Sequence, residues 1–191
     1  MGAKTSKLNS SSFVHLHNHT QYSLLDGLTK IPDLVKYIKE KGSDAVAMTD
    51  HGTLSGTIEF YKEAKAAGIK PIIGIETYVA TRKHTDKDPA KDKNRFHLIL
   101  LAMNNTGYQN LMRLSTIANL DGFYYFPRID HDLLEKYNEG LIALSACMGG
   151  EVGNALKDDN VKKAEEIASW YKGIFGDRYY LEVQDHGHPK N

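Results

Sequence analysis

Three histidines alternate along residues 13–27, and an aspartate follows them near the end of the stretch. Single residues separate His15, His17 and His19, and Asp26 stands just before a glycine. In an extended strand alternate side chains share one face, so this spacing predicts a face lined with imidazoles. Crowded imidazoles need solvent or a divalent cation, and Asp26 could return across a turn as an oxygen ligand. The stretch therefore predicts a metal site; the alternative is a surface strand with incidental histidines.

The elements that must position these residues alternate between strand and helix patterns. Helical periodicity, with Pro32 near its start, covers residues 29–42, and a second helical pattern covers residues 55–68. Apolar runs after each helix predict strands, the first leading into His51 and the second, residues 70–80, carrying Glu76. This order is typical of a parallel sheet with crossover helices, whose functional groups gather at the carboxyl ends of the strands. We therefore expect His51 and Glu76 to join the first histidines at one mouth.

Two later residues join the set if the topology allows it. His97 begins the strand pattern RFHLILLA, where a strictly parallel arrangement would place it at the wrong end. Antiparallel pairing between residues 77–80 and 98–101 returns His97 to the mouth, and we adopt that geometry. Cys147 ends the strand pattern GLIALSAC, where a thiolate beside a divalent metal would coordinate readily. A single cysteine is otherwise most often a small buried hydrophobe.

Other charged residues allow more than one interpretation. The loop at residues 82–95 holds six basic and three acidic residues, which suits a solvated loop or a basic flap over an anionic substrate. Arg128 could bind a phosphate or form a structural ion pair. His84 is expected to face solvent, and His131 is expected to cap a helix or face solvent. Glu182 and His186 fall near the end of a last strand, and neither is assigned as a ligand.

Composition sets limits on the class of protein. The chain has 191 residues and a formal net charge of zero, which suits one globular domain without the general positive field of a self-sufficient nucleic-acid binder. One cysteine excludes an internal disulfide and fits a reducing cytoplasm. No run is apolar enough to span a membrane. The polar, serine-rich residues 1–12 predict a disordered lead-in, and residues 13–191 form the predicted domain.

Five stretches together resemble the polymerase and histidinol phosphatase (PHP) family, in the branch at the amino end of bacterial DNA polymerase III alpha subunits. They are HLHNHTQYSLLDG, AMTDHGTLSG, KPIIGIETYV, RFHLILLAMNNTGYQNL and NEGLIALSACMGGEV. The resemblance implies an α/β fold, a distorted (β/α)7 TIM-like barrel with up to three divalent metals. By motif it implies a ligand set of seven residues, His17, His19, Asp26, His51, Glu76, His97 and Cys147. His15 and Asp50 take supporting positions.

The resemblance also has a gap. The family completes its site with an Asp-x-His pair on a later strand, and this chain ends before such a pair, so we expect a barrel truncated before its last strand or strands. DHGH at the terminus is not a clear substitute.

The chemistry implied is metal-assisted hydrolysis of phosphoesters, with zinc, manganese or iron. In the polymerase branch this implies a 3′–5′ exonuclease within a cytoplasmic DNA-directed DNA polymerase, with a DNA 3′ end and other replicase subunits as partners. Two alternatives stay open. One is a stand-alone small-molecule phosphatase of the same family, and the other is a metal-stabilised structural module that docks replicase partners without catalysis.

Overall fold

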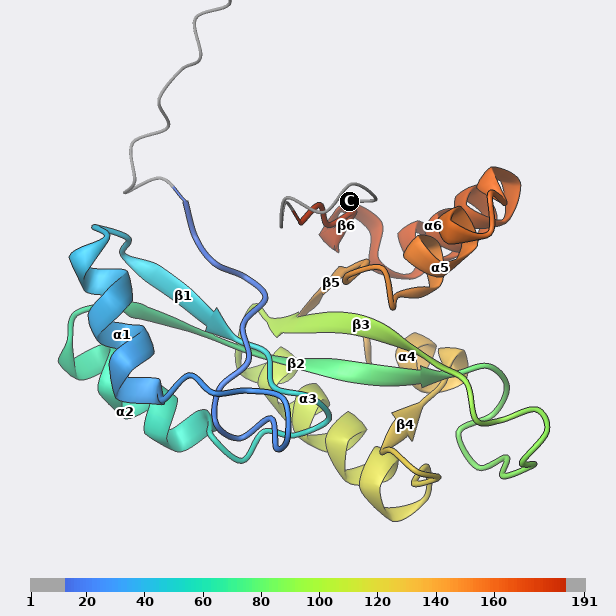
Figure 1. Ribbon diagram of the computed structural model, residues 1–191, viewed down its shortest axis with the longest axis horizontal. Coiled ribbons are helices and arrows are strands. Elements are labelled where there is room, and N and C mark those ends of the chain that lie inside the picture. Colours follow the sequence, from blue (N-terminus) through green and yellow to red (C-terminus); the bar gives the residue numbers. More distant parts are fainter. Residues whose placement is uncertain (1–12, 185–191) are drawn as a thin grey trace, which may run out of the picture.

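The structure is a computed structural model that describes residues 13–184 (Figure 1). The predicted lead-in at residues 1–12 and His186 lie outside the described residues. Within them the chain forms a six-stranded mixed sheet and six α-helices, which confirms the α/β class. The elements in chain order are α1 Ile31–Glu40, β1 Ala45–Met48, α2 Thr57–Ala66, β2 Lys70–Ala80, β3 Arg95–Ala102, α3 Asn105–Leu120, β4 Arg128–Ile129, α4 His131–Tyr137, β5 Leu141–Leu144, α5 Glu151–Lys157, α6 Val161–Phe175 and β6 Tyr179–Tyr180.

The sheet runs in the order β1-β2-β3-β5-β6, and β4 pairs with β2 beside this path. β1 and β2 are parallel, whereas β2 and β3 are antiparallel, with Tyr78 opposite His97. The predicted antiparallel return of this strand is therefore confirmed, but its register differs: residues 77–80 lie opposite residues 95–98, and residues 98–101 lie opposite residues 74–77. The connection between β2 and β3, residues 81–94, contains no crossover helix and so lets the chain return beside the strand it left.

The helices form where the apolar periodicity predicted them. α1 has a proline in its first turn, buries Leu34, Val35 and Ile38, and is followed by Gly42 at φ 73°, a value that favours glycine. These side chains pack with Val46 of β1 and with α2 in one apolar cluster. The helix α5 was not predicted, because the sequence GGEVGNAL lacks a clear helical stripe.

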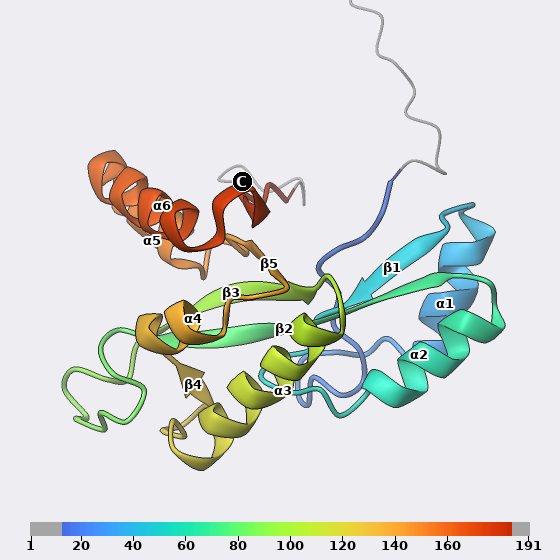
Figure 2. The ribbon, with the colours of Figure 1, turned by 180° about the vertical axis from the view of Figure 1, so that it is seen from behind.

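The two faces of the long hairpin β2–β3 have different roles. Leu98 and Leu100 point into the main core, which α3, α4 and α6 complete, and Figure 2 shows α3 lying along the hairpin. Ile99 and Leu101 point the other way, into a smaller cluster with Leu144 of β5. Because side chains alternate along a strand, Glu76, Tyr78 and His97 share the face of this smaller cluster.

The prediction of a regular strand around His15, His17 and His19 was wrong. Residues 14–19 make a single bridge, His15 with Val46, rather than a regular ladder. The Asn18 side chain donates to the backbone oxygens of His15 and Ala47, and the Asn18 N–H donates to Thr49 Oγ1. Side-chain bonds thus replace part of the ladder and still dock the segment beside β1.

No helix in the described part of the chain is long and apolar enough to cross a membrane.

Candidate metal centre

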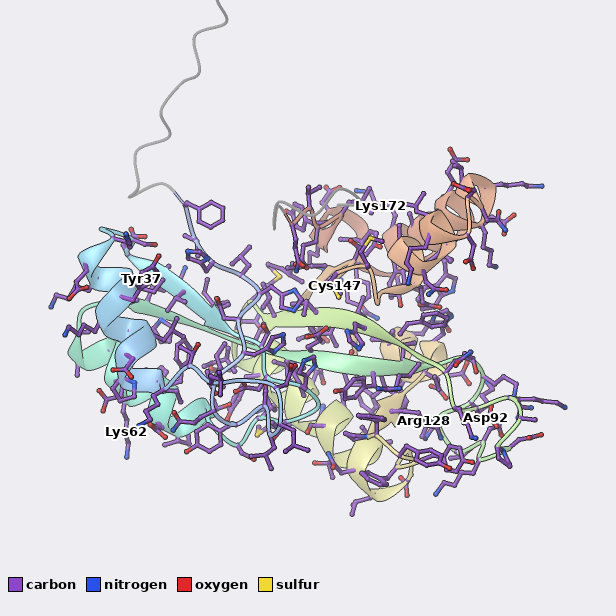
Figure 3. The ribbon with its side chains drawn as sticks, in the orientation of Figure 1. Tyr37, Lys62, Asp92, Arg128, Cys147 and Lys172 are labelled. Carbon is purple, nitrogen blue, oxygen red and sulfur yellow. The ribbon has the colours of Figure 1, made fainter. Side chains whose placement is uncertain are left out.

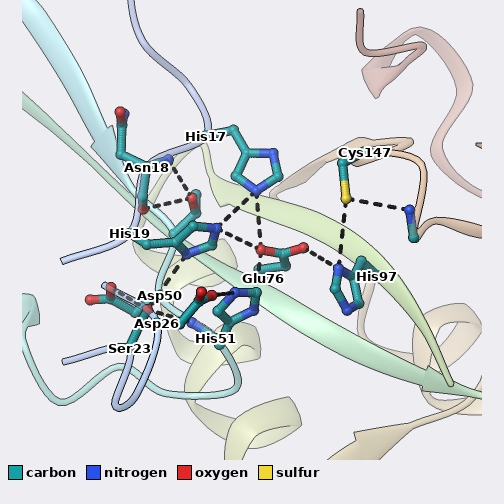
Figure 4. A network of polar contacts seen from close by, with 12 residues as sticks. His17, Asn18, His19, Ser23, Asp26, Asp50, His51, Glu76, His97 and Cys147 are labelled. Atoms are coloured by element: carbon teal, nitrogen blue, oxygen red, sulfur yellow. Dashed lines mark hydrogen bonds and ion pairs between the residues drawn. The ribbon is translucent and has the colours of Figure 1, made fainter. Parts of the chain in front are cut away.

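Glu76 lies at the centre of a group of histidines drawn from separate elements (Figure 4). The β2 strand holds it on the inner face of the sheet, where its side chain is 1% exposed. One carboxylate oxygen, Oε2, lies 3.0 Å from His17 Nε2 and 2.9 Å from His19 Nε2. The other oxygen, Oε1, lies 2.7 Å from His97 Nδ1 on β3. A single buried carboxylate therefore contacts three of the predicted ligands.

His51 and Asp26 complete one side of this group. His51 follows β1, and its Nε2 lies 2.6 Å from Asp26 Oδ2, while its Nδ1 lies 3.3 Å from Glu76 Oε2. The His51 ring also stacks on the ring of His19, with 4.1 Å between centroids. Asp26 reaches this position from the turn that follows the docked segment, and its side chain is 63% exposed. Asp26 therefore lies on the solvent side of the group, whereas the His51 side chain is only 16% exposed.

Cys147 lies on the other side of the group, on a strained turn after β5. Ala146 has φ 60°, and a Cβ on Gly150 would come within 2.1 Å of the Ser145 carbonyl oxygen, so the turn requires glycine there. The turn brings Cys147 Sγ to 3.8 Å from His97 Nδ1, and the Gly149 N–H donates to the sulfur. The structure thus links all seven predicted ligands in one cluster.

The nitrogen, oxygen and sulfur atoms of this cluster are better suited to bind divalent cations than to form hydrogen bonds with one another. The buried atoms Glu76 Oε1 and His51 Nδ1 have no hydrogen-bond partner, although each lies close to another polar atom. Two groups of three ligand atoms, each within 4.8 Å of one another, share Glu76: His17, His19 and Glu76, and Glu76, His97 and Cys147. Imidazole, carboxylate and thiolate donors at this separation suit zinc, manganese or iron. These residues could therefore hold two cations with Glu76 between them.

Without a cation, protons hold the group together. Burial opposes protonation of His17, but hydrogen bonds with Glu182 and Glu76 outweigh it and raise the His17 pKa to about 10. Contacts with Cys147 and Glu76 raise the pKa of His97 to about 9, and the same contact with His97 lowers the pKa of the Cys147 thiol. Burial would raise the pKa of Glu76, but its histidine neighbours hold that pKa well below its usual range. A cation would replace these protons.

Asp50 supports the site indirectly. It is fully buried and accepts hydrogen bonds from the N–H and hydroxyl of Thr20 and from the Ser23 hydroxyl. Ser23 Oγ in turn accepts from the His51 N–H and lies 3.5 Å from His19 Nδ1. Asp50 therefore fixes the turn from which His19 and His51 are presented.

His15 was expected to orient its neighbours. Within the described residues its ring packs edge-on against Phe13, and no hydrogen bond joins it to a ligand. The backbone oxygen of His15 instead accepts from the Ala47 N–H. His15 therefore holds its own segment beside β1 and does not orient the ring of a ligand histidine.

Sequence reasoning missed Glu182, which belongs to this site. Glu182 Oε1 lies 2.7 Å from His17 Nδ1, on the side of the ring away from Glu76. Gln184 Nε2 lies 3.0 Å from the same nitrogen, and the Glu182 N–H donates to Ser145 Oγ. A carboxylate on the second nitrogen of a histidine fixes the ring and its tautomer. The only sequence signal was its place just beyond the last strand.

The expectation that Arg128 could bind a phosphate does not hold. Arg128 is 1% exposed, and its three nitrogens all donate to backbone oxygens, those of Gly122, His84, Asp86 and Asp92. Figure 3 shows Arg128 beside Asp92, at the loop of residues 82–95. Four of its five N–H groups are thus used to organise that loop, and the buried side chain is not presented to a ligand.

The expectation for His84 was wrong, and that for His131 was correct only in part, because the His131 side chain is 40% exposed. His84 does not face solvent, because its Nδ1 lies 2.6 Å from Asp130 Oδ2 and its side chain is 18% exposed. His131 is the first residue of α4, but the cap is Asp130, which accepts from the Leu133 N–H. The His131 ring instead stacks on Trp170, with 3.9 Å between centroids.

Comparison with known proteins agrees with this arrangement. The family model described as PHP domain matches residues 15–186, which includes all seven clustered residues. The chain belongs to the PHP family. Two relatives are DNA polymerase III subunit alpha of Aquifex aeolicus, 54% identical over 187 residues, and that of Borreliella burgdorferi, 52% identical over 178 residues. These alignments cover 95% and 93% of this chain but 16% of each relative, so the PHP chain spans about a sixth of their length.

The solved structures that match the chain are more distant. A two-domain protein of Bacteroides vulgatus, containing a predicted PHP-like metal-dependent phosphoesterase, has a TM-score of 0.39 at 14% identity, over 78% of this chain and 41% of that one. An amidohydrolase of Chromobacterium violaceum has a TM-score of 0.39 at 20% identity, over 53% and 32%. Likenesses this distant add nothing to the family assignment.

Proposed function

We propose that the chain is the metal-dependent phosphoesterase domain of a bacterial replicative DNA polymerase, acting as a 3′–5′ exonuclease on DNA. The observation that carries the proposal is the clustering of seven imidazole, carboxylate and thiolate side chains around Glu76. The identity of about half of all residues to DNA polymerase III alpha subunits supports DNA as the substrate. A DNA 3′ end and other replicase subunits would then be its partners, in the cytoplasm.

The residues of the cluster would hold the divalent cations and orient the phosphoester beside them. His17, His19 and Glu76 would form one binding group, and Glu76, His97 and Cys147 the other. His51 and Asp26 lie beside the first group, with Asp26 at the solvent side. Bound divalent cations would lower the pKa of a water and stabilise the charge that develops on the phosphate oxygens. The backbone of Glu76 pairs with β3 on one side and bridges to His51 on the other, which fixes the carboxylate that the two groups share. The exposed Asp26 leaves that side open to an ester.

Hydrolysis by the metal-loaded chain tests the proposal. A DNA oligonucleotide labelled at its 5′ end, incubated with manganese, should be shortened from its 3′ end, and Glu76→Gln should abolish the shortening. Preferential hydrolysis of p-nitrophenyl phosphate would instead favour the small-molecule phosphatase. Metal binding without hydrolysis of either substrate, also when the chain is extended toward the length of its relatives, would favour the structural module.

A further inference from the structure

Arg95 lies on the same face of the sheet as the metal centre. It begins β3, opposite Ala80, and is two residues before His97. Because side chains alternate along a strand, Arg95 and His97 point to the same side, with about 7 Å of strand between them. The ring of Tyr78 lies between them, 5.3 Å from the Arg95 guanidinium carbon and 5.4 Å from the His97 ring centroid. One aromatic ring therefore separates this cation from the predicted ligands.

The guanidinium of Arg95 has no anionic partner among residues 13–184. Arg82 pairs with Asp92, Arg128 donates to backbone oxygens, and Arg178 donates to the carbonyl oxygen of Asn138. Arg95 forms no ion pair or side-chain hydrogen bond in that part of the chain, and its Nε is buried without a partner. A buried donor without an acceptor is costly, so this arrangement is typical of a site that a ligand completes.

Aromatic rings hold the guanidinium in place instead. Its carbon lies 3.4 Å from the centroid of Phe126, and Phe126 packs against Tyr78 with 5.0 Å between centroids. A guanidinium stacked on a ring keeps its plane fixed, while the N–H groups on its edge stay available for a planar or tetrahedral anion. The stack thus orients Arg95 without using its hydrogen-bond donors.

We propose that Arg95 binds a phosphate oxygen of the ester substrate at the rim of the metal centre. This inference rests on the proposed function for its substrate, and it assigns the phosphate-binding role that sequence reasoning had considered for Arg128. Carboxylates of Glu76, Asp26 and Glu182 give the site negative charge, so an anionic ester gains from a fixed cation beside it.

The test uses Arg95→Met and Arg95→Lys, with Lys93→Met as the matched control. Lys93 is exposed and two residues away, so its loss removes the same charge from the same end of the loop. Calorimetric titration with inorganic phosphate measures binding, on both manganese-loaded and metal-free protein. Hydrolysis of bis(p-nitrophenyl) phosphate gives KM and kcat, and thermal melting and metal content show whether each variant keeps its fold and its cations.

Arg95→Met should weaken phosphate binding about tenfold or more, the size of a lost charge-assisted hydrogen bond. It should raise KM for the diester more than it lowers kcat. Arg95→Lys should fall between the wild type and Arg95→Met, because lysine keeps the charge but not the planar fork, and Lys93→Met should bind like the wild type. If Arg95→Met has a lower melting temperature than the wild type, the phosphate affinities of Arg95→Lys and Arg95→Gln are compared with that of the wild type instead.

Equal phosphate affinity in Arg95→Met, Lys93→Met and wild type would overturn the proposal, as would a wild type that binds no phosphate. A wild type that binds phosphate through Arg95 but hydrolyses no ester, also when the chain is extended toward the length of its relatives, would leave the Arg95 phosphate site standing and overturn the proposed function. The two failures are therefore distinguishable.

Discussion

Glu76 and His97 face each other across the β2–β3 hairpin, with Glu76 Oε1 2.7 Å from His97 Nδ1. The second oxygen of the same carboxylate contacts His17 and His19, which come from the amino-terminal segment. Antiparallel pairing places His97 here, since a parallel β3 would carry it to the opposite end of the sheet. One side chain therefore joins two ligand groups that are far apart in the sequence.

Glu76→Gln should disrupt both ligand groups at once. An amide carries no charge and offers one oxygen, so we expect metal affinity to fall by at least about tenfold at both groups. Metal per chain after dialysis measures this loss. Glu59→Gln is the control, because Glu59 is also bonded to a neighbour, the Tyr22 hydroxyl, but lies on α2 away from the cluster. Loss of only part of the metal would show that Glu76 is not shared.

Cys147→Ser should change the chemistry of one group only. Cobalt bound beside a thiolate gives a charge-transfer band in the near ultraviolet, and we expect this band in the wild type and its loss in Cys147→Ser. His97 contacts lower the pKa of the thiol, so the band should form at neutral pH. His17→Ala should keep the band, because His17 lies in the other group. A cobalt-loaded wild type without this band would contradict the assignment of Cys147.

The pH dependence of the metal-free chain follows from His17. Its pKa is raised from 6.5 to about 10, so protonation favours the folded state. The stability it contributes is complete below about pH 6.5 and is lost as the pH rises toward about 10. The melting temperature of the metal-free chain should therefore fall over this interval, and His97, with a pKa of about 9, acts in the same direction.

Glu182→Gln separates this effect from other titrations. Glu182 is a main cause of the raised His17 pKa, so the variant should be less stable than the wild type near pH 6 and should match it near pH 10. The metal-loaded chain should show the opposite slope, because ligands must lose their protons to bind. A metal-free melting temperature that rises from pH 6.5 to 9 would contradict this account.

Arg128→Met should destabilise the fold without changing the metal ligands. Four backbone oxygens would lose a buried donor, which should cost about 3 kcal/mol or more in the free energy of unfolding. Arg113→Met is the control, since Arg113 is exposed on α3 and its loss should cost about 0.5 kcal/mol or less. Denaturant titration gives both values. Equal stability of the two variants would show that the loop does not depend on Arg128.

Sequence patterns predicted most of the framework because periodicity reports which face of an element is buried. The apolar stripe of residues 29–42 became α1, and the strand at residues 70–80 was predicted to its ends. The antiparallel return of β3 followed from where His97 had to lie. These features depend on the local apolar periodicity of each element and on the choice of antiparallel rather than parallel pairing for β3.

The features that sequence could not predict depend on contacts between distant segments. The first segment looks like a strand, and only the Asn18 bonds to its neighbour show why a full ladder is absent. Glu182 reaches His17 across 165 positions. Arg128 and Arg95 both stand beside aromatic residues in the sequence. In the structure Arg128 donates four hydrogen bonds to backbone oxygens, whereas the buried Nε of Arg95 has no partner.

Elemental analysis of the freshly purified chain tests the central claim most directly. We expect zinc, manganese or iron at about one ion or more per chain in the wild type, since two groups of three ligand atoms that share Glu76 are present. His17→Ala combined with His19→Ala should remove the ion of the first group. A wild type that contains no transition metal, and that takes up none from solution while its melting curve shows a folded chain, would contradict the metal centre.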